Sequence, residues 1–279
     1  MTTYDPSFDI DYQKCGSWDN PFDPTINGSS VTFATSDGTC ASGRVVSKQA
    51  YKNITKITAT VDLSKMSQNY VNASYYLISN PTNPTVQPIG DDYCDAGGNR
   101  DDQNARELDL METNGNKITQ TTLHLGDGGS AAPQRFEFSF TEKANNSCFN
   151  YASMLTSPAS DNGLHSLVDS IDMSKPFESA TTFTYGDNPT MVMQFTQDGK
   201  TVTVYDSNNG DGAYGSGSVK MSDLTNTMAD GCWIILSQWQ GYSPKGPSNG
   251  VWWNDSCGWG QECGTDSHWG ISNIVVTAE

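Results

Sequence analysis

Short runs in which apolar and polar residues alternate dominate the chain, and a period of two predicts β-strands. Phe136, Phe138 and Phe140 are each separated by a polar residue. The predicted strands Thr190–Gln197 and Lys200–Asp206 flank Asp198-Gly199, a dipeptide typical of two-residue hairpin turns. The other predicted strands are Arg44–Lys48, Ile54–Leu63, Val71–Ser79, Arg106–Thr113, Ile118–Leu125, Thr181–Tyr185, Cys232–Trp239 and Trp269–Thr277.

Many short strands separated by turn residues indicate an all-β sandwich or barrel. No amphipathic helix longer than about two turns is predicted. No internal repeat or linker divides the chain, so we expect a single domain over residues 1–279. Two long loops, Asn80–Ala105 and Asn145–Pro176, are expected to carry function, because long loops on a compact sandwich often do.

The net charge of the chain limits the classes of molecule that it can bind. Its 279 residues carry 32 acidic and 15 basic side chains, a formal net charge of −17. Nucleic acids and anionic membrane surfaces are therefore excluded as partners, because both need clustered Lys and Arg. With 35% hydrophobic residues the chain can bury a core. It contains no apolar run of about 18 residues, so no membrane-spanning helix is predicted.

Seven cysteines and no C-x-x-C pair favour disulfides over a zinc or thioredoxin-like site. We expect one to three disulfides in a secreted protein, with Cys257 and Cys263 as the easiest local pair. The first residues, Met1–Asp5, are not a signal peptide, because they lack a basic region followed by an apolar stretch. Either the chain works where it is made, or this is a mature form.

The most informative segment is Glu107-Leu108-Asp109-Leu110-Met111-Glu112, because it holds two of only seven Glu residues. On a strand, Glu107 and Asp109 share one face, and Leu108 and Leu110 point into the other layer. Glu112 would normally face the opposite side. We therefore predict a β-bulge near Leu110–Met111 that returns Glu112 to the face of Glu107.

This spacing suits the cleavage of glycosidic bonds. With the bulge, Glu107 and Glu112 are about four strand steps apart, and inward-leaning side chains leave roughly 5 Å between the carboxylates. That separation is typical of retaining glycosidases, in which one carboxylate attacks and the other holds a proton. Asp109 lies between them and can share a proton with a Glu. The alternatives are a solvated acidic face or a calcium site.

The E-L-D-L-M-E motif, followed by T-x-H, resembles the clan of retaining β-glucanases on the concanavalin A-like jelly roll. That clan includes the family 7 cellulases and the family 16 β-glucanases. Ser42–Lys48 is similar to a family 16 stretch. Further segments resemble family 7, in chain order: Asn72–Leu77, Tyr93–Asp95, Glu112–Asn114, Thr122–His124, Ser237–Trp239 and Trp253–Ser256.

The resemblance implies a role for each matching residue. Glu107 would be the nucleophile, Glu112 the acid/base and Asp109 the assisting acid. The expected substrate-binding residues are Tyr75 and Asp95 on the glycone side, His124 on the leaving-group side, and Trp239 and Trp253 as stacking platforms. Trp233 and Trp269 lie inside strand patterns, and we expect them in the core.

We therefore expect an all-β, two-sheet antiparallel jelly roll with an open concave cleft. Its expected function is retaining, endo-acting hydrolysis of internal β-1,4 or β-1,3 linkages in a neutral glucan. No cofactor and no metal are expected, and the protein is expected to be a monomer. Two alternatives stay open: a non-catalytic lectin-like or structural protein on the same fold, and a transglycosylase.

Overall fold

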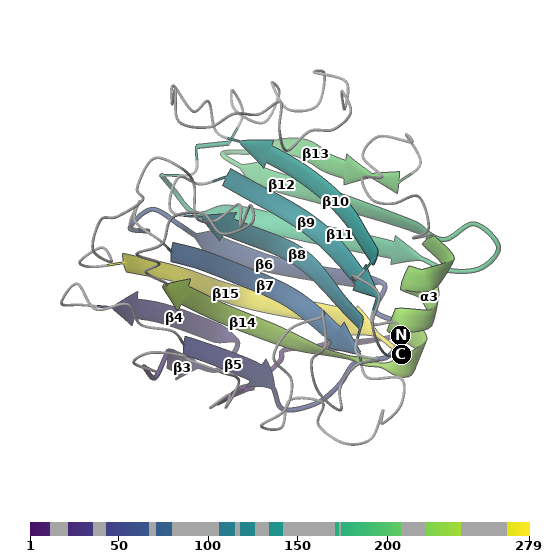
Figure 1. The fold of residues 1–279 in the computed structure, drawn as a ribbon, viewed down its shortest axis with the longest axis horizontal. Coiled ribbons are helices and arrows are strands. Elements are labelled where there is room, and N and C mark those ends of the chain that lie inside the picture. Colours follow the sequence, from purple (N-terminus) through teal and green to yellow (C-terminus); the bar gives the residue numbers. More distant parts are fainter. Residues whose placement is uncertain are drawn as a thin grey trace.

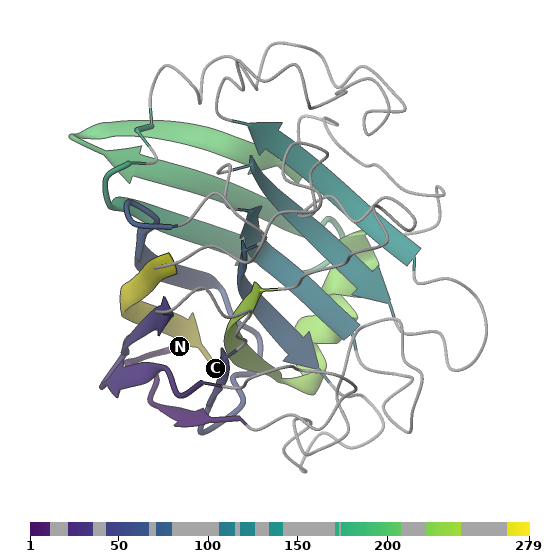
Figure 2. The same cartoon turned by 60° about the vertical axis from the view of Figure 1, so that its left-hand side comes forward.

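The computed structural model describes residues 1–11, 22–35, 43–66, 71–79, 106–114, 118–125, 134–141, 171–172, 174–207, 221–240 and 267–279. These residues form two antiparallel β-sheets packed face to face, with one helix beside them (Figures 1 and 2). Within the described ranges no helix has the length and apolar character needed to cross a membrane.

One layer, the outer sheet, has the strand order β13-β12-β11-β6-β15-β4-β3, and β1 also pairs with β15. Its strands are β13 (Lys200–Asp206), β12 (Thr190–Gln197), β11 (Phe177–Thr184), β6 (Lys56–Asp62), β15 (Ser267–Ala278), β4 (Ser30–Thr35), β3 (Thr25–Asn27) and β1 (Thr2–Tyr4). Its register is interrupted within the β12–β13 and β15–β6 pairs.

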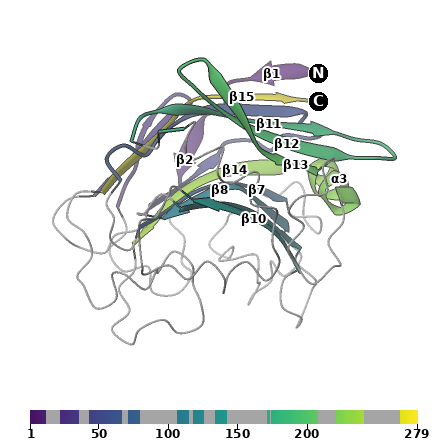
Figure 3. The same cartoon turned by 90° about the horizontal axis from the view of Figure 1, so that it is seen from above.

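The other layer, the concave sheet, has the order β10-β9-β8-β7-β14-β5-β2. Its strands are β10 (Gln134–Thr141), β9 (Ile118–Leu125), β8 (Arg106–Asn114), β7 (Val71–Ser79), β14 (Cys232–Gln240), β5 (Gly43–Ser47) and β2 (Phe8–Ile10). Figure 3 shows this sheet arched, with its hollow side turned away from the outer sheet.

The main hydrophobic core fills the space between the two sheets. Trp269 on β15 stacks on Phe33 of β4 with ring centroids 4.8 Å apart, and Phe177 packs on Phe195 at 4.7 Å. All four rings are almost fully buried. Each comes from the strand face that alternation assigns to the interior. The expectation that Trp269 belongs to the core is confirmed.

The strand predictions are largely confirmed. Alternation gave the bounds of β7, β9, β12 and β13 as the structure has them. Asp198 and Gly199 connect β12 to β13 with φ of 51° and 74°. Positive φ at both turn residues is what a tight hairpin with the natural strand twist requires.

The helix α3 (Met221–Asp230) and the short strands β1 to β4 were not predicted. The helix is rich in Ser, Thr, Asn and Asp, which are weak helix formers. Packing stabilises it instead, because Thr227 and Met228 are fully buried and the Thr227 hydroxyl donates to the carbonyl of Asp223. Gly231, with φ of 92°, ends the helix. A glycine directly after a helix is a common sign of a helix end, and it is the one feature of the sequence that points to this helix.

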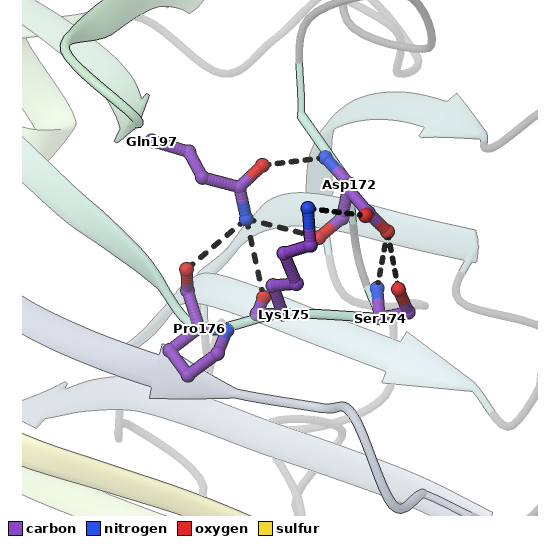
Figure 4. A network of polar contacts seen from close by, with 5 residues as sticks. All are labelled: Asp172, Ser174, Lys175, Pro176 and Gln197. Atoms are coloured by element: carbon purple, nitrogen blue, oxygen red, sulfur yellow. Dashed lines mark hydrogen bonds and ion pairs between the residues drawn. The ribbon is translucent and has the colours of Figure 1, made fainter.

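The chain enters β11 through a turn that Gln197 holds (Figure 4). The Gln197 side-chain amide donates to the carbonyls of Asp172 (2.9 Å), Pro176 (3.0 Å) and Lys175 (3.3 Å), and its oxygen accepts from the Asp172 N–H at 2.7 Å. Hydrogen bonds from Ser174, and then Lys175, lower the pKa of Asp172. These residues form the described end of the long loop expected at Asn145–Pro176.

The disulfide prediction is tested at one cysteine, because the other six and the long loop Asn80–Ala105 lie outside the described residues. Cys232 is buried with a free thiol, which donates to the Thr227 carbonyl at 3.4 Å. Burial raises its pKa well above the ordinary value, and the nearby Asp230 carboxylate raises it further. The Cys232 thiol is therefore expected to be unreactive.

Candidate active site

A bulge in β8 brings the three acids of the motif to one face. In the pairing with β7, Glu107 lies opposite Ile78, Asp109 opposite Tyr76, and Glu112 opposite Ser74. Leu110 has no partner, and the register with β9 shifts at the same place. The predicted bulge at Leu110–Met111 is confirmed, and its extra residue restores Glu112 to the side of Glu107 and Asp109.

Burial shows which face this is. Leu108, Leu110 and Met111 are almost fully buried in the core between the sheets. Glu107 and Glu112 are partly exposed on the opposite, concave face, and Asp109 between them is only 2% exposed. The arrangement places two accessible carboxylates on either side of a buried one.

The structure corrects the expected role of Tyr75. Its side chain is 1% exposed and belongs to the core between the sheets, so it cannot line the cleft. Adjacent strand residues point to opposite faces, and Tyr76 therefore faces the acids instead. Tyr76 packs with Val46, Ile78, Trp233 and Ile235 in a smaller cluster on the concave face.

Tyr76 is in electrostatic contact with the acids. Burial is the main cause of its raised pKa, Arg44 acts in the opposite direction, and Glu107 raises the pKa further. The Ser237 hydroxyl shares a side-chain hydrogen bond with Tyr76, and the Asp109 carboxylate has a smaller effect in the same direction as Glu107. The Tyr76 phenol is therefore neutral and sits within the electrostatic field of both carboxylates.

Arg44 brings a positive charge to the same face. It lies opposite Ser237 in the pairing of β5 with β14, is 1% exposed, and donates from Nε to Asp11 at 2.7 Å. A second guanidinium nitrogen also donates to Asp11. In the sequence, Arg44 stands out only as part of the stretch Ser42–Lys48. Its place on the concave face follows from the pairing of β5 with β14, and the sequence of one strand does not contain that pairing.

Asn72 on β7 contacts Glu112 directly. Its side-chain Nδ2 donates to Glu112 Oε1 at 3.1 Å, and the residue is only 4% exposed. Asn72 lies opposite Asn114 in β8, one alternating position along from the Ser74–Glu112 pair. It is thus a diagonal neighbour of Glu112 on the concave face. The sequence alone does not predict this contact.

Comparison with solved structures agrees with this architecture. An endoglucanase I solved with cellobiose matches with a TM-score of 0.59 at 14% identity, over 90% of this chain and 77% of that one. A Bacillus licheniformis β-glucanase matches at 0.50 and 11% identity, over 98% and 92%. A pseudo β-1,3-glucanase of Mycobacterium tuberculosis matches at 0.51 and 11%, over 97% and 90%.

The fold is that of the jelly-roll glucanases. No protein-family model matches the chain, and no curated protein matches it significantly. The likeness therefore shows the architecture of the jelly-roll glucanases, with the concave sheet carrying the acids. A shared fold does not determine the reaction, which depends on the residues of the site.

Of the other predicted substrate-binding residues, His124 and Trp239 lie on described strands. The strand register sets His124 opposite Glu107 and Trp239 opposite Asn72. Their roles in sugar binding stay predictions. Asp95 and Trp253 lie outside the described residues. Trp233 is buried as expected, but in the cluster on the concave face with Tyr76.

A protein site for a metal ion needs several His, Cys, Asp or Glu side chains arranged around one point. Among the residues that the structure describes, no group of three or more such side chains is arranged to hold one. The acids of β8 are instead surrounded by protein groups: Asn72 on Glu112, and Tyr76 close to Glu107 and Asp109.

Proposed function

We propose that this protein is a retaining, endo-acting glycoside hydrolase that cleaves internal β-1,4 or β-1,3 linkages of a neutral glucan. The observation that carries the proposal is the bulge in β8. It sets Glu107 and Glu112 on one concave face with Asp109 buried between them. A pair of carboxylates flanking the scissile bond is what glycoside hydrolysis by double displacement requires.

In the first step, the Glu107 carboxylate attacks the anomeric carbon while Glu112 donates its proton to the glycosidic oxygen. The bond between the sugar and the leaving chain breaks, and a covalent glycosyl-enzyme forms on Glu107. In the second step, Glu112 takes a proton from a water molecule, which attacks the anomeric carbon and releases Glu107. A sugar hydroxyl in place of that water gives transglycosylation.

Asp109 and Tyr76 assist from within the sheet. Three neighbouring carboxyl groups are costly to ionise together, so we expect Asp109 to share a proton within the row. The Tyr76 hydroxyl, fixed by Ser237, presents a neutral hydrogen-bonding group beside Glu107 and Asp109. Together they hold the nucleophile in position.

The overall charge agrees with a neutral polysaccharide. A net charge of −17 repels anionic polymers, and nothing about it hinders an uncharged glucan. Because a polysaccharide is too large to enter a cell, we also propose that the protein acts outside it. Internal cleavage is proposed from the likeness to a protein that is named an endoglucanase.

The first experiment is the release of reducing sugar from cellulose, mixed-linkage glucan, laminarin and galactan. We expect activity on at least one, and retention of anomeric configuration by NMR. Glu107→Gln should reduce kcat on the order of a thousandfold or more. Glu178→Gln is the matched control, because Glu178 is an exposed residue of the outer sheet.

A 2-fluoro glycoside should label Glu107, identified by peptide mass spectrometry, because it traps the covalent intermediate. A wild type that releases no sugar from any polymer contradicts the enzyme proposal. It would favour the alternative, a carbohydrate-binding protein without catalysis. One protein with a similar fold, from Mycobacterium tuberculosis, is described as a pseudo β-1,3-glucanase. Binding of a glucan without cleavage would then be measured by calorimetry.

A further inference from the structure

The contact between Asn72 and Glu112 uses only half of the Asn72 amide. Nδ2 donates to Glu112 Oε1 at 3.1 Å. The other half, Oδ1, is buried and accepts no hydrogen bond. A buried polar atom without a partner costs roughly 1–3 kcal/mol. The Asn72 side chain is 4% exposed, so its unpaired oxygen needs a physical explanation.

A primary amide can serve both protonation states of a carboxyl group. Its NH2 group donates to an ionised carboxylate, and its oxygen accepts from a protonated one. The two arrangements differ by a half-turn about the Cβ–Cγ bond, which exchanges Nδ2 and Oδ1 and leaves the shape unchanged. An aspartate in this place can only accept, and an alanine can do neither.

Glu112 is the carboxyl group that needs a partner in both of its protonation states. This step rests on the proposed function, in which Glu112 is protonated before the first half-reaction and ionised before the second. The structure contains the arrangement for the ionised state. The unused Oδ1 supplies the arrangement for the protonated state.

We propose that Asn72 is a positioning residue for Glu112 that follows its protonation, donating from Nδ2 to the carboxylate and accepting at Oδ1 from the carboxylic acid. No covalent bond changes in this step. The proton that Glu112 gives up passes to the glycosidic oxygen, and the amide turns to donate to the carboxylate left behind. Asn72 thus keeps Glu112 in one rotamer through both half-reactions.

Other titratable groups lie on the same sheet as Glu112. Glu107 and Asp109 lie on its own strand, and Tyr76 lies on β7. Arg44, paired with Asp11, lies further along the same face on β5. On β9 the strand register adds His124, opposite Glu107. Only the Asn72 amide is replaced in the test, so these groups stay constant.

The test is Asn72→Asp, which keeps the shape and removes the donor. Because Asp can only accept, it favours protonated Glu112. We expect the basic limb of the kcat/KM profile to move up by about one pH unit. With an activated aryl glycoside, kcat and KM should both fall about tenfold, because the second half-reaction then limits turnover. A basic limb that stays in place overturns the proposal.

Asn53→Asp is the matched control. Asn53 also donates from Nδ2 to a glutamate, Glu279 Oε2, at 2.5 Å, and it lies outside the concave sheet. The same change of charge there should leave the profile in place. Equal shifts in both variants would show a general charge effect and overturn the proposal. Because Asn72→Asp also adds a charge beside Glu112, Asn72→Ala is measured alongside it, since this variant removes the donor and adds no charge. We expect a smaller shift of the same sign in Asn72→Ala, and a profile that stays in place in that variant overturns the proposal.

A readout without activity separates this inference from the proposed function. The seven Glu carboxyl carbons can be labelled with 13C, and Glu112→Gln assigns the Glu112 signal. The titration midpoint of Glu112 should rise in Asn72→Asp even if no polymer is cleaved. A rise in an inactive protein rejects the glycosidase proposal and keeps the amide coupling. An active protein with an unchanged midpoint rejects the coupling alone.

Discussion

Tyr75 and Tyr76 are neighbours in the chain, and their hydroxyls lie on opposite sides of one strand. The Tyr75 hydroxyl is buried between the sheets without a hydrogen-bond partner. The Tyr76 hydroxyl shares a hydrogen bond with Ser237 beside the acids. Removing the same oxygen atom from each residue should therefore have opposite consequences.

We expect Tyr75→Phe to stabilise the protein by about 1 kcal/mol, because it removes a buried polar group that has no partner. Thermal unfolding should show a melting temperature raised by a few degrees. Hydrolytic activity should be unchanged, since the ring faces the core. A lower melting temperature would show that the hydroxyl has a partner in solution, such as a buried water.

We expect Tyr76→Phe to reduce kcat/KM on the order of tenfold, because a hydrogen-bonding group beside Glu107 and Asp109 is lost. The melting temperature should fall slightly, since Ser237 loses its partner. Initial rates on the best polymer of the panel provide the measurement. A variant as active as Tyr75→Phe would contradict a role for Tyr76 in the site.

The two tyrosines also show what the sequence of a single strand cannot predict. Adjacent residues of a strand point to opposite faces, so only one of the two can line the cleft, and the family resemblance implies the one that the structure buries in the core. The choice depends on which face of β7 meets the acids. That follows from the pairing of Tyr76 with Asp109 across the bulge. A single strand contains no information about its partner's register.

Among the elements, β8 was predictable because its acids are rare and their spacing requires a bulge. The hairpin at Asp198-Gly199 was predictable because few dipeptides accept its backbone angles. Helix α3 was not, because its residues prefer turns and caps in isolation, and burial of Met228 decides its conformation.

The turn before β11 depends on the last residue of β12. We expect Gln197→Glu to destabilise the protein by on the order of 3 kcal/mol at neutral pH, because three backbone carbonyls lose their donor and face a carboxylate. Denaturant unfolding measures the loss. It should shrink as the pH falls, since protonation of the introduced carboxylate restores a donor.

Gln194→Glu is the control on the same strand, because the Gln194 amide donates to Thr203 at an exposed position. Its expected effect is below about 0.5 kcal/mol. If both variants unfold at the same denaturant concentration, the Gln197 network does not stabilise the turn. A deficit that grows at low pH would contradict the electrostatic explanation.

For the whole molecule, the excess of acids should make stability depend on salt. The formal charge of −17 opposes the compact state through self-repulsion, and ions screen it. We expect the melting temperature to rise by several degrees between about 10 mM and about 500 mM sodium chloride, with most of the rise at low salt. Calorimetry at constant pH gives the measurement. A flat or falling curve would show that attractive pairs such as Arg44–Asp11 dominate.

The two-sheet architecture could be predicted from the sequence, and the order of the strands could not. Alternation indicates which residues face the core but not which strand lies beside another. The concave sheet joins Val71–Ser79 to Cys232–Gln240, and the latter to Gly43–Ser47. Arg44, Ser237 and Tyr76 meet only through these long-range pairings, which no local pattern encodes.

That strand order also governs when the site can form during folding. β7, β8, β9 and β10 follow one another along the chain and pair in sequence, so the acids can be assembled early. β14 completes the face only after residue 240 has been synthesised, because it inserts between β7 and β5. Closing such distant pairs is slow, on the order of milliseconds to seconds. Until then one edge of β7 is open, and this nascent protein should need protection against aggregation.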